Sequence, residues 1–312
     1  MNAKHFERLV QISNDPETRE KSIEYLAEHL GKFLKSGECV MLAFRHHAPG
    51  TISFLMEQAA LRIGAVPVIW GPDHRWNTLL RQTYQSRASA VIGSPLVILG
   101  LMKLKKHSNT PLPIRKVVTV GYPCLDWVIE GIVKGLDCEL GGCFSVDEEG
   151  IVAGFACGHD WGVHLREEIY GVDIVDTQGN VLPRGELGEV VLWPKADPTA
   201  RVHLGDLGRI AREKCACGSK SPRLTDLQLG KNVDPDLYKL AQELQSWTSI
   251  LDCRIAKTAS GLELEIICFP GEKLPKLPTA AKLVVRAYSP KTDEPFWFNP
   301  DRLNQGIYVK KD

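Results

Sequence analysis

RVHLGDLGRIAREKCACGSKSPRLTDLQLGK, residues 201–231, brings three different signals together in one segment. An aspartate stands in a Leu-Gly-Asp turn, a Cys-x-Cys-Gly turn follows, and a Gly-Lys step ends a strand-like run. Two thiolates this close can hold one metal ion, but they also occur in ordinary turns, and aspartate is itself a common turn residue. Signals elsewhere in the chain are needed to distinguish a binding segment from ordinary turns.

Upstream of this segment, short apolar runs alternate with longer runs of helical period. Asp15 followed by Pro16 predicts the start of an amphipathic helix, and the apolar runs at 39–44 and 66–70 flank a helical stretch at 51–63. This alternation predicts βαβ units, so we expect an α/β fold with a mostly parallel sheet and helices on both faces. From residue 138 the pattern changes to strands joined by turns, which predicts a β-rich section over 138–230.

Beyond residue 230 the sequence predicts a small α+β unit. A short helix at 235–244 precedes two alternating runs about the Ser260-Gly261 turn, which is typical of a hairpin. We therefore expect a core over 1–230, α/β to about residue 140, and a C-terminal domain over 231–312.

Composition excludes several classes of function. The 312 residues include 38 Lys plus Arg and 38 Asp plus Glu, so no basic field favours a nucleic-acid partner. No run of about 18 apolar residues occurs, and the charged N-terminus lacks the apolar region of a signal peptide, so we expect a cytoplasmic protein with no membrane partner. Nine cysteines, several of them in strand-like apolar runs, favour reduced thiols over a disulfide framework.

The order of motifs in 201–231 resembles that of adenylate-forming enzymes of the phenylacetate-CoA ligase branch. VHLGDLG at 202–208 is similar to their YRTGDLG turn, and GELGEVVL at 185–192 to their GExGELV strand. VGYPCL at 120–125 resembles their Gly-x-x-Pro element, and GCFSVDEEG at 142–150 occupies the place of their YGxTE turn. The resemblance covers most of the chain, from about the first strand to the Gly-Lys hinge.

The resemblance implies an AMP-dependent carboxylic acid–CoA ligase, which forms an acyl-adenylate from ATP and an acid and then transfers the acyl group to CoA. Asp206 would hold the ribose hydroxyls, and Gly121, Tyr122 and Pro123 would flank the adenine. Glu148 falls at the position of the Mg²⁺-associated glutamate, although three consecutive acids at 147–149 are also typical of a solvated turn. Rotation of the C-terminal domain near Lys231 would separate the two half-reactions.

One departure from the family keeps a second hypothesis open. The family wraps the ATP phosphates with a loop of the form SSGTTGxP, and the nearest substitutes here, 46–51 and 93–95, are too short to present several N–H groups to a polyphosphate. The alternative is a non-catalytic module that binds a nucleotide, an acyl-CoA or a partner protein. We consider two assemblies. One is a complex with a partner chain that supplies the missing loop, and the other is a homodimer.

The resemblance also implies a metal site. Cys157 and His164 match the place where relatives carry a Cys and a Gly-Leu-His turn, and in some relatives these positions bind zinc together with the equivalents of Cys215 and Cys217. Three thiolates and one imidazole close a tetrahedral Zn²⁺ site, so the expected zinc is structural. The alternative is four reduced side chains packed together, with His159 or His203 as competing ligands. His46 and His47 follow a strand end, where each could face a substrate or solvent.

Overall fold

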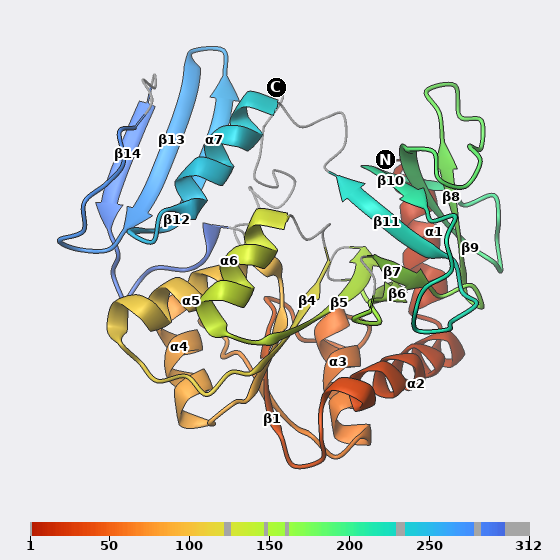
Figure 1. Ribbon diagram of the computed structural model, residues 1–312, viewed down its shortest axis with the longest axis horizontal. Helices are drawn as coiled ribbons and strands as arrows, with labels where there is room; N and C mark the ends of the chain where they lie inside the picture. Colours follow the sequence, from red (N-terminus) through yellow and green to blue (C-terminus); the bar gives the residue numbers. More distant parts are fainter. Residues whose placement is uncertain are drawn as a thin grey trace.

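The computed structural model describes residues 2–121, 126–146, 149–159, 162–228, 235–277 and 282–296 (Figure 1). The predicted positions Tyr122, Pro123, Glu148 and Lys231 lie outside these residues. The fold is mixed α/β, as the sequence predicts, with one large sheet, helices on both of its faces and a smaller sheet near the C-terminus.

The first part of the large sheet is parallel. Its strands occur in the order β2-β1-β3-β4-β5, and each pairs with its neighbours in parallel. Helices connect the strands, as the alternating apolar runs predict. The strands are β1 (Cys39–Ala43), β2 (Val66–Ile69), β3 (Ala90–Gly93), β4 (Lys116–Val120) and β5 (Glu139–Val146), and the connecting helices are α3 (Ile52–Arg62), α4 (Trp76–Gln85), α5 (Pro95–Ser108) and α6 (Asp126–Leu136).

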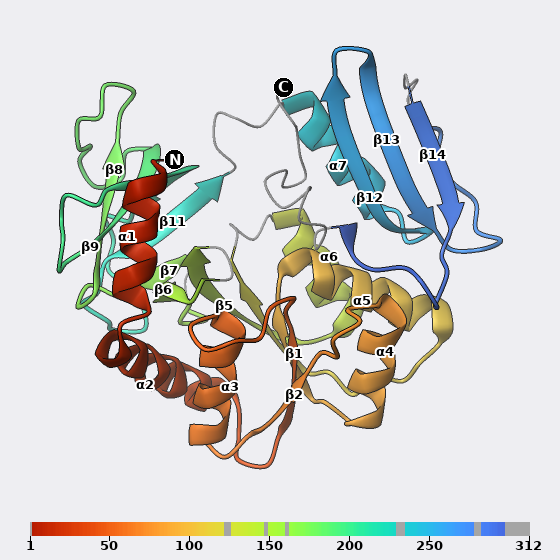
Figure 2. The ribbon, with the colours of Figure 1, turned by 180° about the vertical axis from the view of Figure 1, so that it is seen from behind.

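Helices cover this part of the sheet on both faces (Figures 1 and 2). Side chains of α4, α5 and α6 form one hydrophobic cluster, and those of α2 (Pro16–Phe33) and α3 form the other. The Asp15 carboxylate accepts from the N–H groups of Glu17 and Thr18, so the predicted helix start is confirmed. An additional helix, α1 (Ala3–Ser13), precedes it and packs its apolar side against the antiparallel strands.

The sheet continues without a break into antiparallel strands. From β5 the order is β6-β7-β11-β10-β9-β8, which gives eleven described strands in one sheet. β7 therefore lies beside β11, while the three strands between them in sequence form the far end of the sheet. The bounds are β6 (Ile151–Phe155), β7 (Val163–Leu165), β8 (Tyr170–Val175), β9 (Gly188–Pro194), β10 (Val202–Ile210) and β11 (Arg223–Gln228).

The C-terminal part consists of α7 (Pro235–Ser246) on a three-stranded sheet. β12 (Ile250–Thr258) and β13 (Gly261–Cys268) pair as an antiparallel hairpin in which Thr258 lies opposite Gly261, so the predicted hairpin is confirmed. β14 (Lys282–Ala287) adds to β13 in parallel. Strand and helix side chains form a small core of their own, centred on Leu244, Ile255 and Leu264.

The outer strand β2 has a proline on its open side. The Val66 N–H donates to the Glu38 carbonyl, just before β1, and the Trp70 N–H to the Leu42 carbonyl within it. By the alternation of a strand, Pro67 therefore faces away from β1. Among the described residues no helix is long and apolar enough to cross a membrane.

Candidate functional site

Four predicted metal ligands meet at one place in the structure. One ligand atom from each of Cys157, His164, Cys215 and Cys217 lies within 4.8 Å of all the others. Cys157 follows β6, His164 lies in β7, and the two remaining cysteines lie in the turn between β10 and β11. Because β7 pairs with both β6 and β11, residues 58 positions apart in sequence are brought together.

Two separations between ligand atoms are close to those around a tetrahedral ion. The Cys157 and Cys215 sulfur atoms are 3.4 Å apart, and the Cys217 sulfur is 3.3 Å from His164 Nε2. Ligand atoms around a tetrahedral Zn²⁺ are separated by about 3.5–3.8 Å, given zinc–ligand bonds of about 2.0–2.3 Å. A disulfide bond is only about 2.0 Å long, and the cysteines here are free thiols.

Hydrogen bonds orient the ligands. His164 Nδ1 lies 3.1 Å from the Ser221 carbonyl oxygen, and since a carbonyl only accepts, Nδ1 carries the proton. The Nε2 lone pair therefore faces the cysteines, as a metal-bound histidine requires. The Ser219 N–H donates to the Cys217 sulfur at 3.4 Å, which favours a thiolate at that position.

The electrostatics of the cluster favours a bound cation. The Ser219 N–H bond lowers the pKa of Cys217, but burial and the neighbouring Cys215 and Cys157 sulfurs outweigh it, so the pKa is raised overall. Crowded sulfurs resist becoming thiolates unless a positive charge compensates them. Three cysteines and one histidine thus suit a metal ion whose four coordination positions are all filled by the protein. The competing histidines stand apart: His159 Nδ1 contacts the Cys157 carbonyl, and His203 pairs with Glu189 at 3.3 Å.

Asp206 lies in an irregular stretch of β10. The register between β10 and β9 shifts between His203 and Leu207, and Gly205 within this stretch has φ +82°, a conformation that favours glycine. Asp206 is half-buried. A bulge of this kind turns side chains away from the regular alternation and is common beside binding sites.

Gly121 follows the carboxyl end of β4. Its φ is +93°, its N–H donates to the Cys143 carbonyl of β5 at 3.2 Å, and the space where a Cβ would stand is open to 4 Å. This position lies at the carboxyl edge of the sheet, where α/β proteins often bind ligands. Of the five predicted nucleotide-binding residues, the structure therefore describes Asp206 and Gly121.

His47 is held by helix α3. Its Nδ1 lies 3.0 Å from the Ser53 hydroxyl and its Nε2 lies 3.3 Å from the Glu57 carboxylate. Sequence reasoning left His46 and His47 open between substrate and solvent, and it missed both partners of His47. Both partners could have been expected on one face of a helix, because Ser53 and Glu57 are four residues apart in the sequence.

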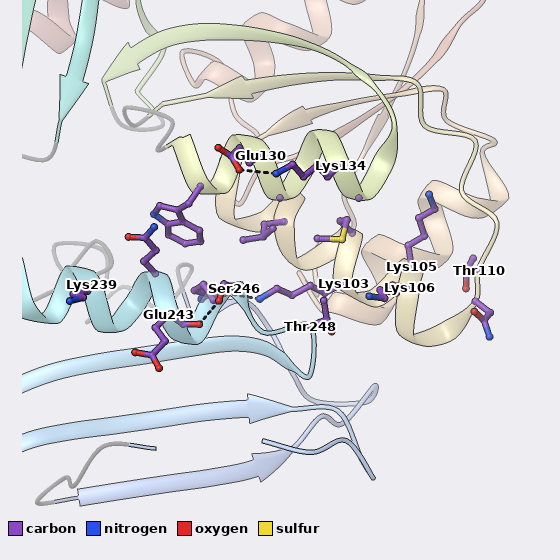
Figure 3. Close-up of a pocket in the computed structure, with 18 residues that line it drawn as sticks. Lys103, Lys105, Lys106, Thr110, Glu130, Lys134, Lys239, Glu243, Ser246 and Thr248 are labelled. Carbon is purple, nitrogen blue, oxygen red and sulfur yellow. Dashed lines mark hydrogen bonds and ion pairs between the residues drawn. The ribbon is translucent and has the colours of Figure 1, made fainter. Parts of the chain in front are cut away.

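A cavity of about 1060 Å³ lies between α5, α6 and α7 (Figure 3). Five lysines and two glutamates are among the residues that line it. Lys105, Lys106 and Lys134 stand in the last turns of their helices, where a positive charge offsets the helix dipole, and Lys134 also pairs with Glu130 at 2.9 Å. These basic side chains thus have a structural role without a ligand.

The similarity of this chain to known proteins lies in its fold. No protein-family model matches the sequence, and no curated protein matches it. Solved structures do match. 2-Hydroxyisobutyryl-CoA ligase in its postadenylation state has a TM-score of 0.67 at 15% identity, over 93% of this chain and 69% of that one. The fold is that of the adenylate-forming ligases.

Other matches extend the likeness to different reactions on the adenylate-forming fold. A benzoate CoA ligase from Burkholderia xenovorans LB400 has a TM-score of 0.54 at 14% identity, over 89% of this chain and 64% of that one. The amide bond synthetase McbA from Marinactinospora thermotolerans has a TM-score of 0.51 at 16% identity, over 81% of this chain and 56% of that one. At these identities the similarity establishes the fold alone. A function has to be argued from the residues of the site.

Proposed function

We propose that this chain binds an adenine nucleotide or an acyl-adenylate as an AMP-dependent carboxylic acid–CoA ligase-like protein. Asp206 carries the proposal, because it combines the motif resemblance with a half-buried position on a strand bulge of the adenylate-forming fold. A carboxylate can accept hydrogen bonds from both ribose hydroxyls together. Gly121 supports it by leaving open space at the carboxyl edge of the sheet.

Calorimetric titration with AMP tests the assignment of Asp206. Hydrogen bonds to a charged group contribute about 1.5–3 kcal/mol, so Asp206→Ala weakens AMP binding about 10- to 150-fold. Glu189→Ala is the matched control, because Glu189 is an acidic residue on the adjacent strand β9, opposite Leu207. Equal AMP affinity of Asp206→Ala and the wild type contradicts the assignment.

A second candidate function rests on the phosphate loop. Because no SSGTTG-like segment occurs in the sequence, a non-catalytic module that binds AMP, CoA or an acyl-CoA is the alternative. Pyrophosphate release from ATP with a panel of aryl and fatty acids separates the two. Release supports the ligase, with Mg²⁺ and CoA as the further requirements. AMP or CoA binding without release supports the module, and release only after a second protein is added supports a partner chain that supplies the loop.

We also propose that the Cys157, His164, Cys215 and Cys217 cluster holds a structural zinc ion. This is supported by the four donor atoms, which are the whole cluster among the residues that the structure describes, and by the fixed histidine tautomer. The ion would tie β6 and β7 to the turn before β11. It would supply cross-linking and no catalytic step.

A further inference from the structure

The outer strand of the small sheet exposes a run of apolar side chains. β14 is the end strand of this sheet, and in both views it lies at the outer edge of the C-terminal part (Figures 1 and 2). Leu283, Val284 and Val285 follow one another along it and are 44%, 39% and 39% exposed. Single exposed apolar residues are ordinary on a protein surface, whereas a contiguous group is typical of a contact with another protein.

Two of these side chains continue a buried core. β13 and β14 pair in parallel, with Leu264 beside Leu283 and Ile266 beside Val285, and each pair lies on the same face of the sheet. Leu264 and Ile266 are at most 1% exposed, because side chains of α7 pack with them in one cluster. The apolar face therefore extends one strand beyond the cover that α7 provides, and burial of this last strand is favourable.

The backbone of β14 is open on the side away from β13. The Tyr288 N–H donates to the Cys268 carbonyl at 2.7 Å, so the Tyr288 backbone faces β13. By the alternation of a strand, the backbone groups of Leu283, Val285 and Ala287 face the opposite way. Within the described ranges no further strand pairs with them. β14 has no proline, and its register with β13 has no shift, so the strand lacks two common barriers to the addition of another strand.

The cations of β14 have acidic partners on the neighbouring strand. Lys282 Nζ lies 4.0 Å from a carboxylate oxygen of Glu263, and Arg286 Nε lies 3.8 Å from one of Glu265. Arg286 also pairs with Asp293. Lysine and arginine protect many sheet edges by repelling a second strand. Here the acidic partners weaken that repulsion.

The sequence of β14 is complementary to itself in one antiparallel register. Two residues whose backbones face outward exchange both hydrogen bonds when they lie opposite each other. With Val285 opposite Val285 of a second copy, Leu283 lies opposite Ala287, so that apolar side chains meet and each cation lies opposite an uncharged residue. The register centred one residue earlier places Lys282 opposite Arg286, which is unfavourable because like charges repel.

We infer that β14 pairs with β14 of a second copy of this chain, antiparallel and centred on Val285. The two small sheets then join into one continuous sheet about a twofold axis. This inference goes beyond the proposed function and depends on neither a nucleotide nor zinc. Because a strand of 6 residues gives a small interface, the association is weak and depends on protein concentration.

Sedimentation velocity of the full chain over a wide range of protein concentrations tests the association. We expect the sedimentation coefficient of the wild type to rise with concentration. Val285→Lys places two ammonium groups opposite each other and is expected to raise the dissociation constant about tenfold or more. Val181→Lys, the same substitution at an exposed valine between β8 and β9, is the matched control and associates like the wild type. A wild type that is monomeric at every concentration, or equal association of the two variants, overturns the inference.

Cysteine cross-linking tests the register. In the proposed pairing the two Val285 Cα atoms are about 5.5 Å apart, which is within the range of a disulfide bond. Val285→Cys is therefore expected to give a covalent dimer with oxidised glutathione, seen on a non-reducing gel. Val284→Cys, at an equally exposed neighbour, is expected to give only the background of the wild type. Equal cross-linking of the two variants contradicts the pairing centred on Val285.

Discussion

Removal of the proposed zinc ion is the perturbation with the most direct structural consequence. An ion that joins Cys157 to Cys215 closes a loop of 58 residues. By the chain-entropy relation for a cross-link, closing such a loop stabilises the folded state by about 4 kcal/mol. With an unfolding entropy of about 2.1 cal/mol/K per residue, 312 residues give a shift of about 1.5 °C per kcal/mol. Chelation is therefore expected to lower the melting temperature by about 6 °C.

Elemental analysis of the purified protein and scanning calorimetry with and without a chelator measure this effect. We expect one zinc ion per chain, and loss of zinc together with the chelator effect in Cys157→Ser. Cys268→Ser is the control, because Cys268 lies in β13 outside the cluster. Protein that contains no zinc, or that melts at the same temperature with chelator as without it, refutes the reasoning.

Two further predictions concern buried side chains, those of Asp252 and Trp76. Burial raises the pKa of Asp252 to about 6, so the folded protein holds this proton more tightly than the unfolded chain. The free energy of unfolding of the wild type should therefore fall, relative to Asp252→Asn, as the pH rises from about 4 to 6, and then stay level; at about 1.4 kcal/mol per pKa unit the fall is on the order of 3 kcal/mol. Urea titrations across this range check it, and parallel curves for the two proteins would contradict it. Gly100→Ala places a Cβ 2.2 Å from the buried Trp76 ring, and overpacking of this kind costs about 1–3 kcal/mol. Gly131→Ala, whose Cβ would meet only the end of Leu99 at 3.0 Å, is the control, and equal urea midpoints for the two variants would show that the ring moves without cost.

Much of the fold follows from local sequence signals. The alternation of apolar runs predicts the parallel strands and their helices, and the Asp15 cap and the Ser260-Gly261 turn mark element boundaries that the structure confirms. The helix α1 was not predicted, because the charges along residues 3–13 obscure the apolar side that packs on the antiparallel strands. That side becomes visible only once its packing partner is known.

Non-local contacts set the limit of sequence reasoning. The four cluster residues came from family resemblance, and their meeting depends on β7 lying beside β11, which no local pattern specifies. Lys103 was not singled out from the sequence, because Lys105 and Lys106 follow it in the same helix and its acceptors, Gln245 and the Ile250 carbonyl, lie 142 and 147 positions away. Asp206 and Gly121 stay predictions for nucleotide binding, as do the zinc ion and the boundary at residue 231.

Pro67 limits how copies of this chain can associate. An outer strand of a large sheet normally offers N–H groups to which the strand of another molecule can add. Here one of the two outward-facing positions of β2 carries a proline, which has no N–H to donate. A sheet that continues from one molecule into the next through β2 is therefore disfavoured, and a homodimer of this protein would have to form through a different surface.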